Sequence, residues 1–217
     1  WRFSVGPRPG LVAFFPGQGQ VLPPDEAVRL VFSTPMDEAS LLAGLSIEPP
    51  VDELSLSVNE TEVRLLSALR PSTLYTITLD ADTRDRGGEP LGAPAVVQLR
   101  TAPARPALAA PEAVAGIVTL PVSRTAELRL ESTNLSALDL SLYPLDRATL
   151  LRALEMGPDE WATFSPERYG QALARAWRVT PTAPVDEPGP VPVELAMDDG
   201  APLPPGAYYL RVTSPEG

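Results

Sequence analysis

The sequence predicts an all-β fold made of two tandem immunoglobulin-like β-sandwiches, the second of which carries a short helical insertion. Runs of alternating apolar and polar residues recur along the chain, and this period of two is typical of half-buried strands. The 27 prolines and 15 glycines favour strands bounded by turns over long helices. The 217 residues, 44% of them hydrophobic, are enough for two domains of about 100 residues, each with its own core.

Residues 1–103 are predicted to form the first sandwich. A first strand covers Leu11 to Phe15, and a turn at Asn59-Glu60 joins two later strands, because asparagine tolerates positive φ at a hairpin corner. The alternating apolar positions are Val28, Leu30 and Phe32; Leu54, Leu56 and Val58; Tyr75, Ile77 and Leu79; and Val97 and Leu99. About seven strands in about 100 residues indicate a β-sandwich.

A short, stiff linker is predicted at residues 104–113. The segment from Thr101 to Pro111 holds three prolines, several alanines and no apolar periodicity. Proline-rich segments of this kind act as semi-rigid spacers. The second domain is therefore expected to cover residues 114–217.

This second domain is predicted to be a sandwich interrupted near residues 146–174 by a helical insertion. Its alternating apolar positions are Ala126, Leu128 and Leu130; Leu138, Leu140 and Leu142; Val191, Val193 and Leu195; and Tyr208, Leu210 and Val212. Asp146 is suited to cap a first inserted helix, which stops at Gly157-Pro158. The apolar residues of this helix are Leu150, Leu151 and Leu154.

A second inserted helix is expected to begin at Ser165-Pro166, a capping residue followed by proline at the first helical position. Tyr169 and Leu173 are expected to share its inner face. Trp161 and Trp177 are expected to pin the insertion to the sandwich, because large aromatic side chains dominate core burial. The alternative is that these two indoles form a platform for a ligand.

The composition excludes several classes of function. The net charge is −11 and no basic stripe occurs, so the phosphates of nucleic acids and anionic lipids would be repelled. Histidine, cysteine and lysine are absent, which removes the common nucleophile–base pairs and every histidine- or thiolate-ligated metal site. No stretch of 18 apolar residues occurs, so no membrane span is expected in this segment. We therefore expect no enzyme activity, no catalytic residue and no cofactor.

The segment from Asp80 to Asp85 is the best candidate for a metal site, because calcium prefers clustered carboxylate oxygens. Arg84 occupies a ligand position, however, and its charge repels a cation. Asp85 is instead expected to bond the backbone of a turn before Gly87-Gly88. Asp198-Asp199-Gly200 is interpreted in the same way, as a turn between the last two strands.

The first half carries motifs that resemble the bacterial Ig-like domains of surface and surface-layer proteins. One motif is a strand followed by Phe-Ser-x-Pro-Met-Asp, here Val28-Arg29-Leu30-Val31-Phe32-Ser33-Thr34-Pro35-Met36-Asp37. The second motif is Leu69-Arg70-Pro71-Ser72-Thr73-Leu74-Tyr75-Thr76-Ile77-Thr78-Leu79. The segment from Asp85 to Leu91 also fits the family pattern, with Glu89 in place of its asparagine. This resemblance covers residues 11–101.

The second half is similar to an early macroglobulin-type domain of bacterial α2-macroglobulins. The similar segments are the Asn134–Tyr143 strand with its continuation to Asp146, the pair Trp161 and Trp177, and the segment Leu203-Pro204-Pro205-Gly206-Ala207-Tyr208-Tyr209-Leu210. An Ig-like domain followed by this element is typical of the amino-terminal region of that family. The resemblance implies a structural, non-catalytic segment of a large, exported, protease-trapping protein. Because the sequence has no cysteine, any thioester of the parent would lie outside it.

The same resemblance implies an extracytoplasmic location, with membrane attachment through another part of the parent. The implied partners are neighbouring domains of the longer chain and, through the parent, proteases. One alternative is an Ig-like spacer or adhesion module of a bacterial cell-surface protein, which would repeat the first module; the Phe-Ser-x-Pro-Met-Asp motif occurs once. Another is a carbohydrate-binding module, which would present a row of aromatics, but only 6% of the residues are aromatic.

Overall fold

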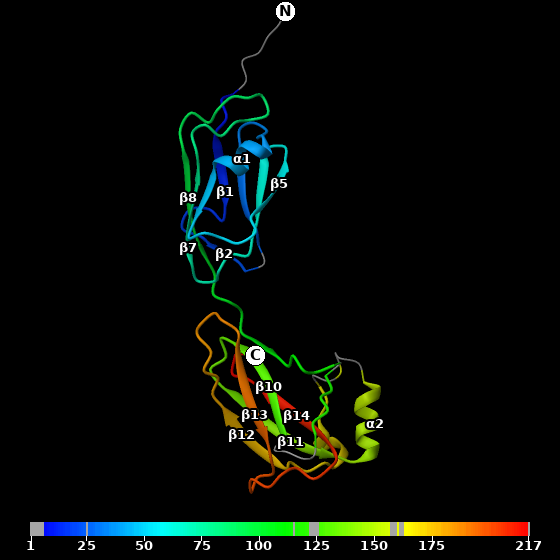
Figure 1. The fold of residues 1–217 in the computed structure, drawn as a ribbon. Helices are drawn as coiled ribbons and strands as arrows, with labels where there is room; N and C mark the ends of the chain where they lie inside the picture. Colours follow the sequence, from blue (N-terminus) through cyan, green and yellow to red (C-terminus); the bar gives the residue numbers. More distant parts are fainter. Residues whose placement is uncertain are drawn as a thin grey trace, which may run out of the picture. The chain divides into compact units, whose positions relative to one another are not determined.

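The computed structural model describes residues 7–24, 26–114, 116–121, 126–156, 160 and 163–216. The chain divides into two compact units, one ending at Ala104 and the other beginning at Arg105. Each unit contains two β-sheets packed face to face (Figure 1). The predicted all-β fold of two tandem immunoglobulin-like sandwiches is confirmed.

The first unit is a sandwich of two four-stranded sheets. One sheet has the order β1 (Leu11–Phe15), β3 (Val28–Phe32), β6 (Glu62–Leu66) and β5 (Ser55–Asn59). The other has the order β2 (Val21–Leu22), β8 (Ala95–Thr101), β7 (Leu74–Leu79) and β4 (Leu45–Glu48). Neighbouring strands are antiparallel except β2 and β8, which run parallel.

Inward-facing apolar side chains from both sheets form the core of this unit. The burial of β3, β7 and β8 alternates residue by residue, as the period of two predicts. Tyr75 on β7 is 1% exposed. Met36, which follows β3, is completely buried and fills the core beside α1.

The hairpin between β5 and β6 corrects one detail of the sequence analysis. Asn59 pairs with Glu62 as the last residue of β5, so it lies in the strand and not at the corner. The positive φ of the turn, 51°, occurs at Glu60. The register of the two strands decides which residue turns, and the sequence alone does not fix that register.

Helix α1 (Glu38–Gly44) is not predicted by the sequence analysis. Asp37 caps it, with Oδ1 accepting a hydrogen bond of 2.8 Å from the N–H of Ser40. Only Leu41 of its seven residues is buried, so the helix has no apolar stripe that a periodicity argument could detect. Gly44 ends the helix against Thr83, where a Cβ would collide with the Thr83 hydroxyl.

The second unit is a sandwich of two three-stranded antiparallel sheets. One has the order β13 (Gly189–Leu195), β10 (Ala126–Thr133) and β9 (Ala107–Ala109). The other has the order β12 (Arg175–Val179), β11 (Leu138–Leu145) and β14 (Ala207–Thr213). Leucines and valines of β10, β11 and β13 are buried at the predicted positions. Strand β12 is an addition to the predicted set.

The predicted linker at residues 104–113 contains a strand. Ala107–Ala109 forms β9, which pairs with Glu131, Ser132 and Thr133 at the end of β10. All three residues of β9 are exposed, so the strand is held by backbone hydrogen bonds at a sheet edge and leaves no apolar alternation in the sequence. This part of the segment therefore belongs to the second sandwich rather than to a spacer.

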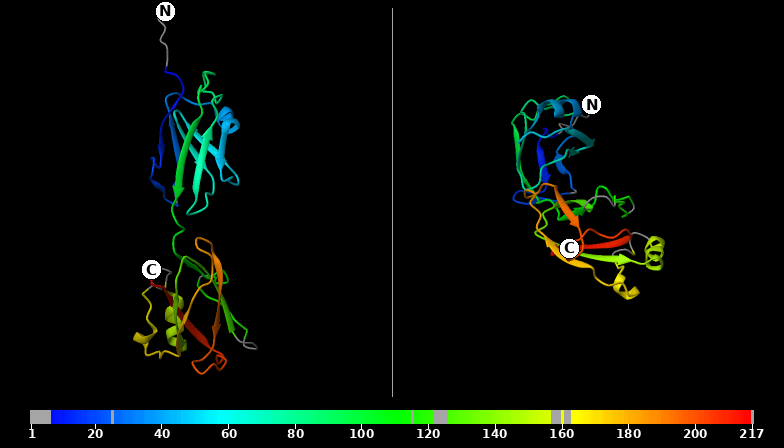
Figure 2. Two further views of the ribbon diagram at one scale, coloured as in Figure 1. Left: turned by 90° about the vertical axis from the view of Figure 1, so that its left-hand side faces the viewer. Right: turned by 60° about the horizontal axis from the view of Figure 1, so that its bottom comes forward.

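The helical insertion between β11 and β12 contains α2 (Arg147–Glu155) and the 3-10 helix η1 (Pro166–Tyr169). As predicted, Asp146 caps α2, with Oδ1 accepting a hydrogen bond of 2.7 Å from the N–H of Thr149. As also predicted, η1 begins at Pro166 after Ser165, but the Ser165 side chain makes no capping hydrogen bond and donates to the Glu167 carboxylate instead. Figure 2 shows α2 leading directly from the end of β11. The predicted stop at Gly157-Pro158 lies outside the described residues.

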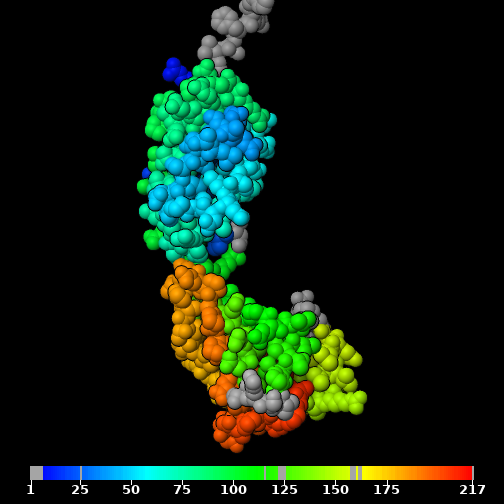
Figure 3. Space-filling view, in the orientation of Figure 1, coloured from blue at the N-terminus to red at the C-terminus, as the bar shows by residue number. Residues whose placement is uncertain are grey.

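Two of the three leucines of α2 are largely exposed, whereas Leu150 is partly buried. Leu151 and Leu154 are about half exposed, at 50% and 49%, and the buried residue of this helix is Thr149. Tyr169 and Leu173, expected on an inner face, are 38% and 50% exposed. Helix α2 lies at the edge of the second unit (Figure 3), so the helical spacing of its leucines does not mark a buried face.

Within the described part of the chain, neither α-helix has the length and apolar character required to cross a membrane.

Candidate functional sites

Glu167 on η1 holds the helical insertion against the outer face of the β11–β14 pair. Its carboxylate accepts hydrogen bonds from the Tyr143 hydroxyl at 2.5 Å, from Ser165 Oγ at 2.6 Å and from both terminal nitrogens of Arg211 at 3.1 and 3.2 Å. Arg211, followed by Ser165 and Tyr143, holds the pKa of Glu167 well below its usual range. Burial, followed by the hydrogen bond to Glu167, raises the pKa of Tyr143. The Glu167 carboxylate has hydrogen-bond partners within the protein on both of its oxygens. This arrangement favours a role in holding the insertion in place over a role in proton transfer.

Phe164 supplies the apolar half of this anchor. It is 4% exposed, and its ring lies 5.0 Å from that of Tyr209 in an edge-on arrangement and 5.8 Å from that of Tyr169 in a stacked one. Trp177 lies on β12 and packs, half-buried, against the second core, with the guanidinium of Arg175 4.4 Å above its ring. Trp161 lies outside the described residues.

Neither of the anchoring residues, Phe164 and Glu167, was predicted from the sequence. The sequence signal was the Ser165-Pro166 helix start, which placed both beside a helical turn. Their partners Tyr143, Tyr209 and Arg211 are 24 to 45 positions away in the chain, so the contacts could not be identified from local spacing.

The acidic segment from Asp80 to Asp85 forms a turn. Oδ1 of Asp85 accepts a hydrogen bond of 2.9 Å from the N–H of Glu89, and Gly88 takes a positive φ of 86°. The guanidinium of Arg84 donates to the carbonyl of Gly88 at 2.6 Å. The predicted role of Asp85 as a turn-stabilising residue is confirmed. Among the residues described, no group of three or more acidic side chains is placed to hold a metal ion.

The Asp198-Asp199-Gly200 segment is also a turn, as predicted. Oδ1 of Asp199 accepts a hydrogen bond of 2.9 Å from the N–H of Ala201, and Gly200 has a φ of 80°. The segment links β13 to β14.

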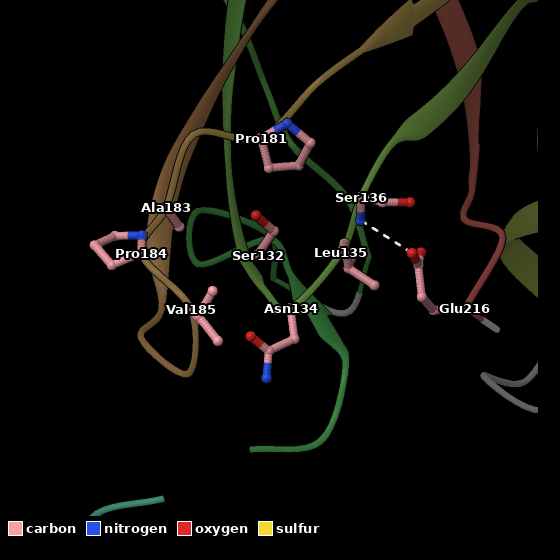
Figure 4. A pocket seen from close by; sticks show the side chains of 9 residues that line it. All are labelled: Ser132, Asn134, Leu135, Ser136, Pro181, Ala183, Pro184, Val185 and Glu216. Atoms are coloured by element: carbon pink, nitrogen blue, oxygen red, sulfur yellow. Dashed lines mark hydrogen bonds between the residues drawn. The ribbon is translucent and has the colours of Figure 1, made fainter. Parts of the chain in front are cut away.

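A pocket of about 300 Å³ lies at one end of the second sandwich (Figure 4). Its apolar wall consists of Leu135, Pro181, Ala183, Pro184 and Val185. Its polar wall consists of Ser132, Asn134, Ser136 and Glu216. These residues come from three segments that are distant in the chain, so local sequence patterns do not predict the pocket.

Two pairs of hydrogen bonds fix the polar wall. The amide of Asn134 donates to the carboxylate of Asp186 and accepts from its backbone N–H, both at 2.8 Å. The carboxylate of Glu216 accepts from the N–H of Ser136 at 3.1 Å and from the hydroxyl of Ser214. These contacts with Ser136 and Ser214 lower the pKa of Glu216 to about 2, so its side chain is an anion at neutral pH.

Comparison with known proteins finds a matching family model for the first unit and similar folds for the chain. Residues 7–101 match the family model of the bacterial Ig-like domain. A crystal structure of a mutant of Salmonella alpha-2-macroglobulin is 19% identical, with a TM-score of 0.68, over 95% of this chain and 13% of that one. A crystal structure of Salmonella alpha-2-macroglobulin reacted with methylamine is 17% identical, with the same TM-score and coverage. No curated protein matches the chain.

The chain therefore spans about an eighth of the length of these Salmonella proteins. At this level of identity the likeness concerns the fold, and the predicted resemblance to bacterial α2-macroglobulin is confirmed in that sense. The first unit matches the bacterial Ig-like domain family, and the chain as a whole has the fold of a portion of bacterial alpha-2-macroglobulin.

Proposed function

We propose that this chain is a non-catalytic structural segment from the amino-terminal region of a bacterial α2-macroglobulin-like protein that traps proteases. The observation that carries the proposal is the ordered pair of units. An Ig-like domain that matches its family over residues 7–101 precedes a sandwich with a helical insertion, and the Salmonella structures share this fold over 95% of the chain.

The polar chemistry of the chain supports a structural role. The whole sequence lacks histidine, lysine and cysteine, so its acid–base groups are mainly carboxylates. The carboxylates with displaced pKa values are bonded to structural partners, such as Glu167 to Arg211 and Asp139 to Arg178. Inhibition of proteases would then be a property of the parent protein, with neighbouring domains as the direct partners of this segment.

The proposed domain limits are residues 1–103 for the Ig-like domain and 114–217 for the main part of the macroglobulin-type domain; within residues 104–113, Ala107–Ala109 joins the second sandwich as β9. The proposed location is extracytoplasmic, as for other proteins that carry bacterial Ig-like domains. Anchoring to a membrane would depend on another part of the parent.

The test compares the parent protein with this 217-residue chain alone. A trap should block the digestion of a large protein substrate while a short chromogenic peptide is still cleaved, because the small substrate reaches an enclosed protease. We expect this pattern for the parent and no inhibition for the isolated chain. Stoichiometric inhibition by the isolated chain would contradict the proposal, and so would a parent that protects no large substrate.

A second candidate is an Ig-like spacer or adhesion module of a bacterial cell-surface protein, which the match of residues 7–101 also favours. This function requires further copies of the first unit in the parent. A parent built from repeated Ig-like domains with a cell-wall or membrane anchor would support this candidate and refute the protease trap.

A further inference from the structure

The pocket of the second unit combines an apolar wall with an unusual polar group. Ser132 is 1% exposed, and its hydroxyl has no hydrogen-bond partner although it lines the pocket. Buried hydroxyls are normally paired, because leaving one unpaired costs about 1–3 kcal/mol. A ligand atom that bonds Ser132 would remove this deficit.

Glu216 gives the pocket a fixed negative charge. Its carboxylate is oriented by the N–H of Ser136 and the hydroxyl of Ser214, as the close view shows for Ser136 (Figure 4). No arginine is among the nine residues that line the pocket. Charge complementarity therefore favours a cationic ligand and opposes phosphates and carboxylates.

The remaining features narrow the choice of cation. Calcium and magnesium require several oxygen ligands, commonly more than one carboxylate, and only one carboxylate lines the pocket. Pro181, Ala183 and Val185 form an apolar wall, and covering it with an apolar part of a ligand is favourable. A volume of about 300 Å³ lies at the lower limit of pockets for small molecules, which suits a single side chain.

We propose that this pocket binds a lysine side chain of another polypeptide. The aliphatic stem packs against the proline–valine wall and Leu135, as lysine stems commonly do. The ammonium has three N–H donors and no acceptor, so it can donate to the Glu216 carboxylate. The almost fully buried Ser132 hydroxyl at the pocket wall is the second acceptor in this proposal. The chain itself contains no lysine, and the side chain comes from a different protein. This inference is independent of the protease-trap proposal.

The experiment titrates the isotopically labelled 217-residue chain with two capped tripeptides and follows backbone amide shifts by NMR. One peptide is acetyl-glycyl-lysyl-glycinamide. The other carries norleucine in place of lysine, which keeps the four-carbon stem and removes only the ammonium. We expect saturable shifts confined to residues 131–136, 181–187 and 214–216 with the lysine peptide. Affinity for the norleucine peptide should be weaker by up to about fivefold, as for loss of one exposed ion pair.

Two variants and a matched control complete the test. Glu216→Gln and Ser132→Ala should each weaken binding of the lysine peptide, by about fivefold for the charge change. Glu194→Gln removes the same charge at the end of β13 that is far from the pocket, where Glu194 lies opposite Glu127 in the strand register. This variant should leave binding of the lysine peptide unchanged. Ser132→Ala removes an unpaired hydroxyl, so it should not reduce stability, and a loss of binding would not reflect unfolding.

Three results would overturn the inference. They are the absence of saturable shifts with the lysine peptide, equal affinity for the norleucine peptide, and an effect of Glu194→Gln equal to that of Glu216→Gln.

Discussion

Tyr75 anchors the first sandwich in two ways that substitutions can separate. Its side chain is 1% exposed within the core, and its hydroxyl accepts a hydrogen bond of 2.8 Å from the backbone N–H of Arg70, five residues upstream. This resembles the tyrosine corner of immunoglobulin-like sandwiches, in which a tyrosine hydroxyl ties a strand to the preceding loop. Truncation to alanine removes both contributions, whereas phenylalanine removes only the hydrogen bond.

The structure sets the expected size of each effect. Tyr75→Ala leaves a cavity the size of a phenol ring in a closely packed core, which typically costs about 3–5 kcal/mol. Tyr75→Phe leaves the N–H of Arg70 without its partner, at a cost of about 1–2 kcal/mol. Leu74→Ala is the matched control, because Leu74 is adjacent in the chain but 59% exposed and should change stability by less than about 0.5 kcal/mol.

Urea unfolding followed by far-ultraviolet circular dichroism measures these differences. The two compact units are expected to unfold in separable steps, so the transition of the second unit serves as an internal control. A loss below about 1 kcal/mol for Tyr75→Ala would refute the core assignment. Equal losses for the alanine and phenylalanine variants would mean that the hydrogen bond alone accounts for the effect.

Other predictions concern a close contact, pH dependence and calcium. Gly44→Ala places a methyl group against the hydroxyl of Thr83. The free energy of unfolding of the first unit, measured in urea, is expected to fall by about 1–3 kcal/mol. An unchanged midpoint would show that the end of the helix can shift without cost. Because the folded-state pKa of Glu167 is depressed, its stabilisation of the second unit is present above the unfolded pKa near 4.3 and is lost as pH falls below it. Stability measured from about pH 6 to about pH 2 should therefore decline less steeply in Glu167→Gln than in the unsubstituted chain. Parallel curves for the two proteins would exclude the anchoring role. Calcium at about 5 mM should leave the melting temperature of the first unit unchanged, because Asp85 bonds the turn backbone; a rise that Asp85→Asn abolishes would contradict this.

The sequence predicted the central strands because burial on one face of a strand imposes a period of two. Val28, Leu30 and Phe32 on β3 are buried as expected, and so are Leu138 and Leu140 on β11. The cap at Asp146 was also predictable, since a capping carboxylate bonds a backbone N–H three residues ahead. These features depend on residues that are close together in the chain.

The spacing of apolar residues did not predict elements whose side chains are mostly exposed. Helix α1 buries only Leu41, and β9 is exposed at all three of its residues, so neither leaves a periodic signal. Leu151 and Leu154 have helical spacing yet are about half exposed, because α2 lies at the surface of the second unit.

The sequence by itself determined the fold class, the two-part organisation and the absence of histidine, lysine and cysteine chemistry. Only the tertiary structure decided which distant residues meet. Glu167 reaches Arg211 across 44 positions, and Ser136 reaches Glu216 across 80. The physical reason is that strand pairing and sheet packing bring such residues together, whereas local periodicity reports only which face of each strand is buried.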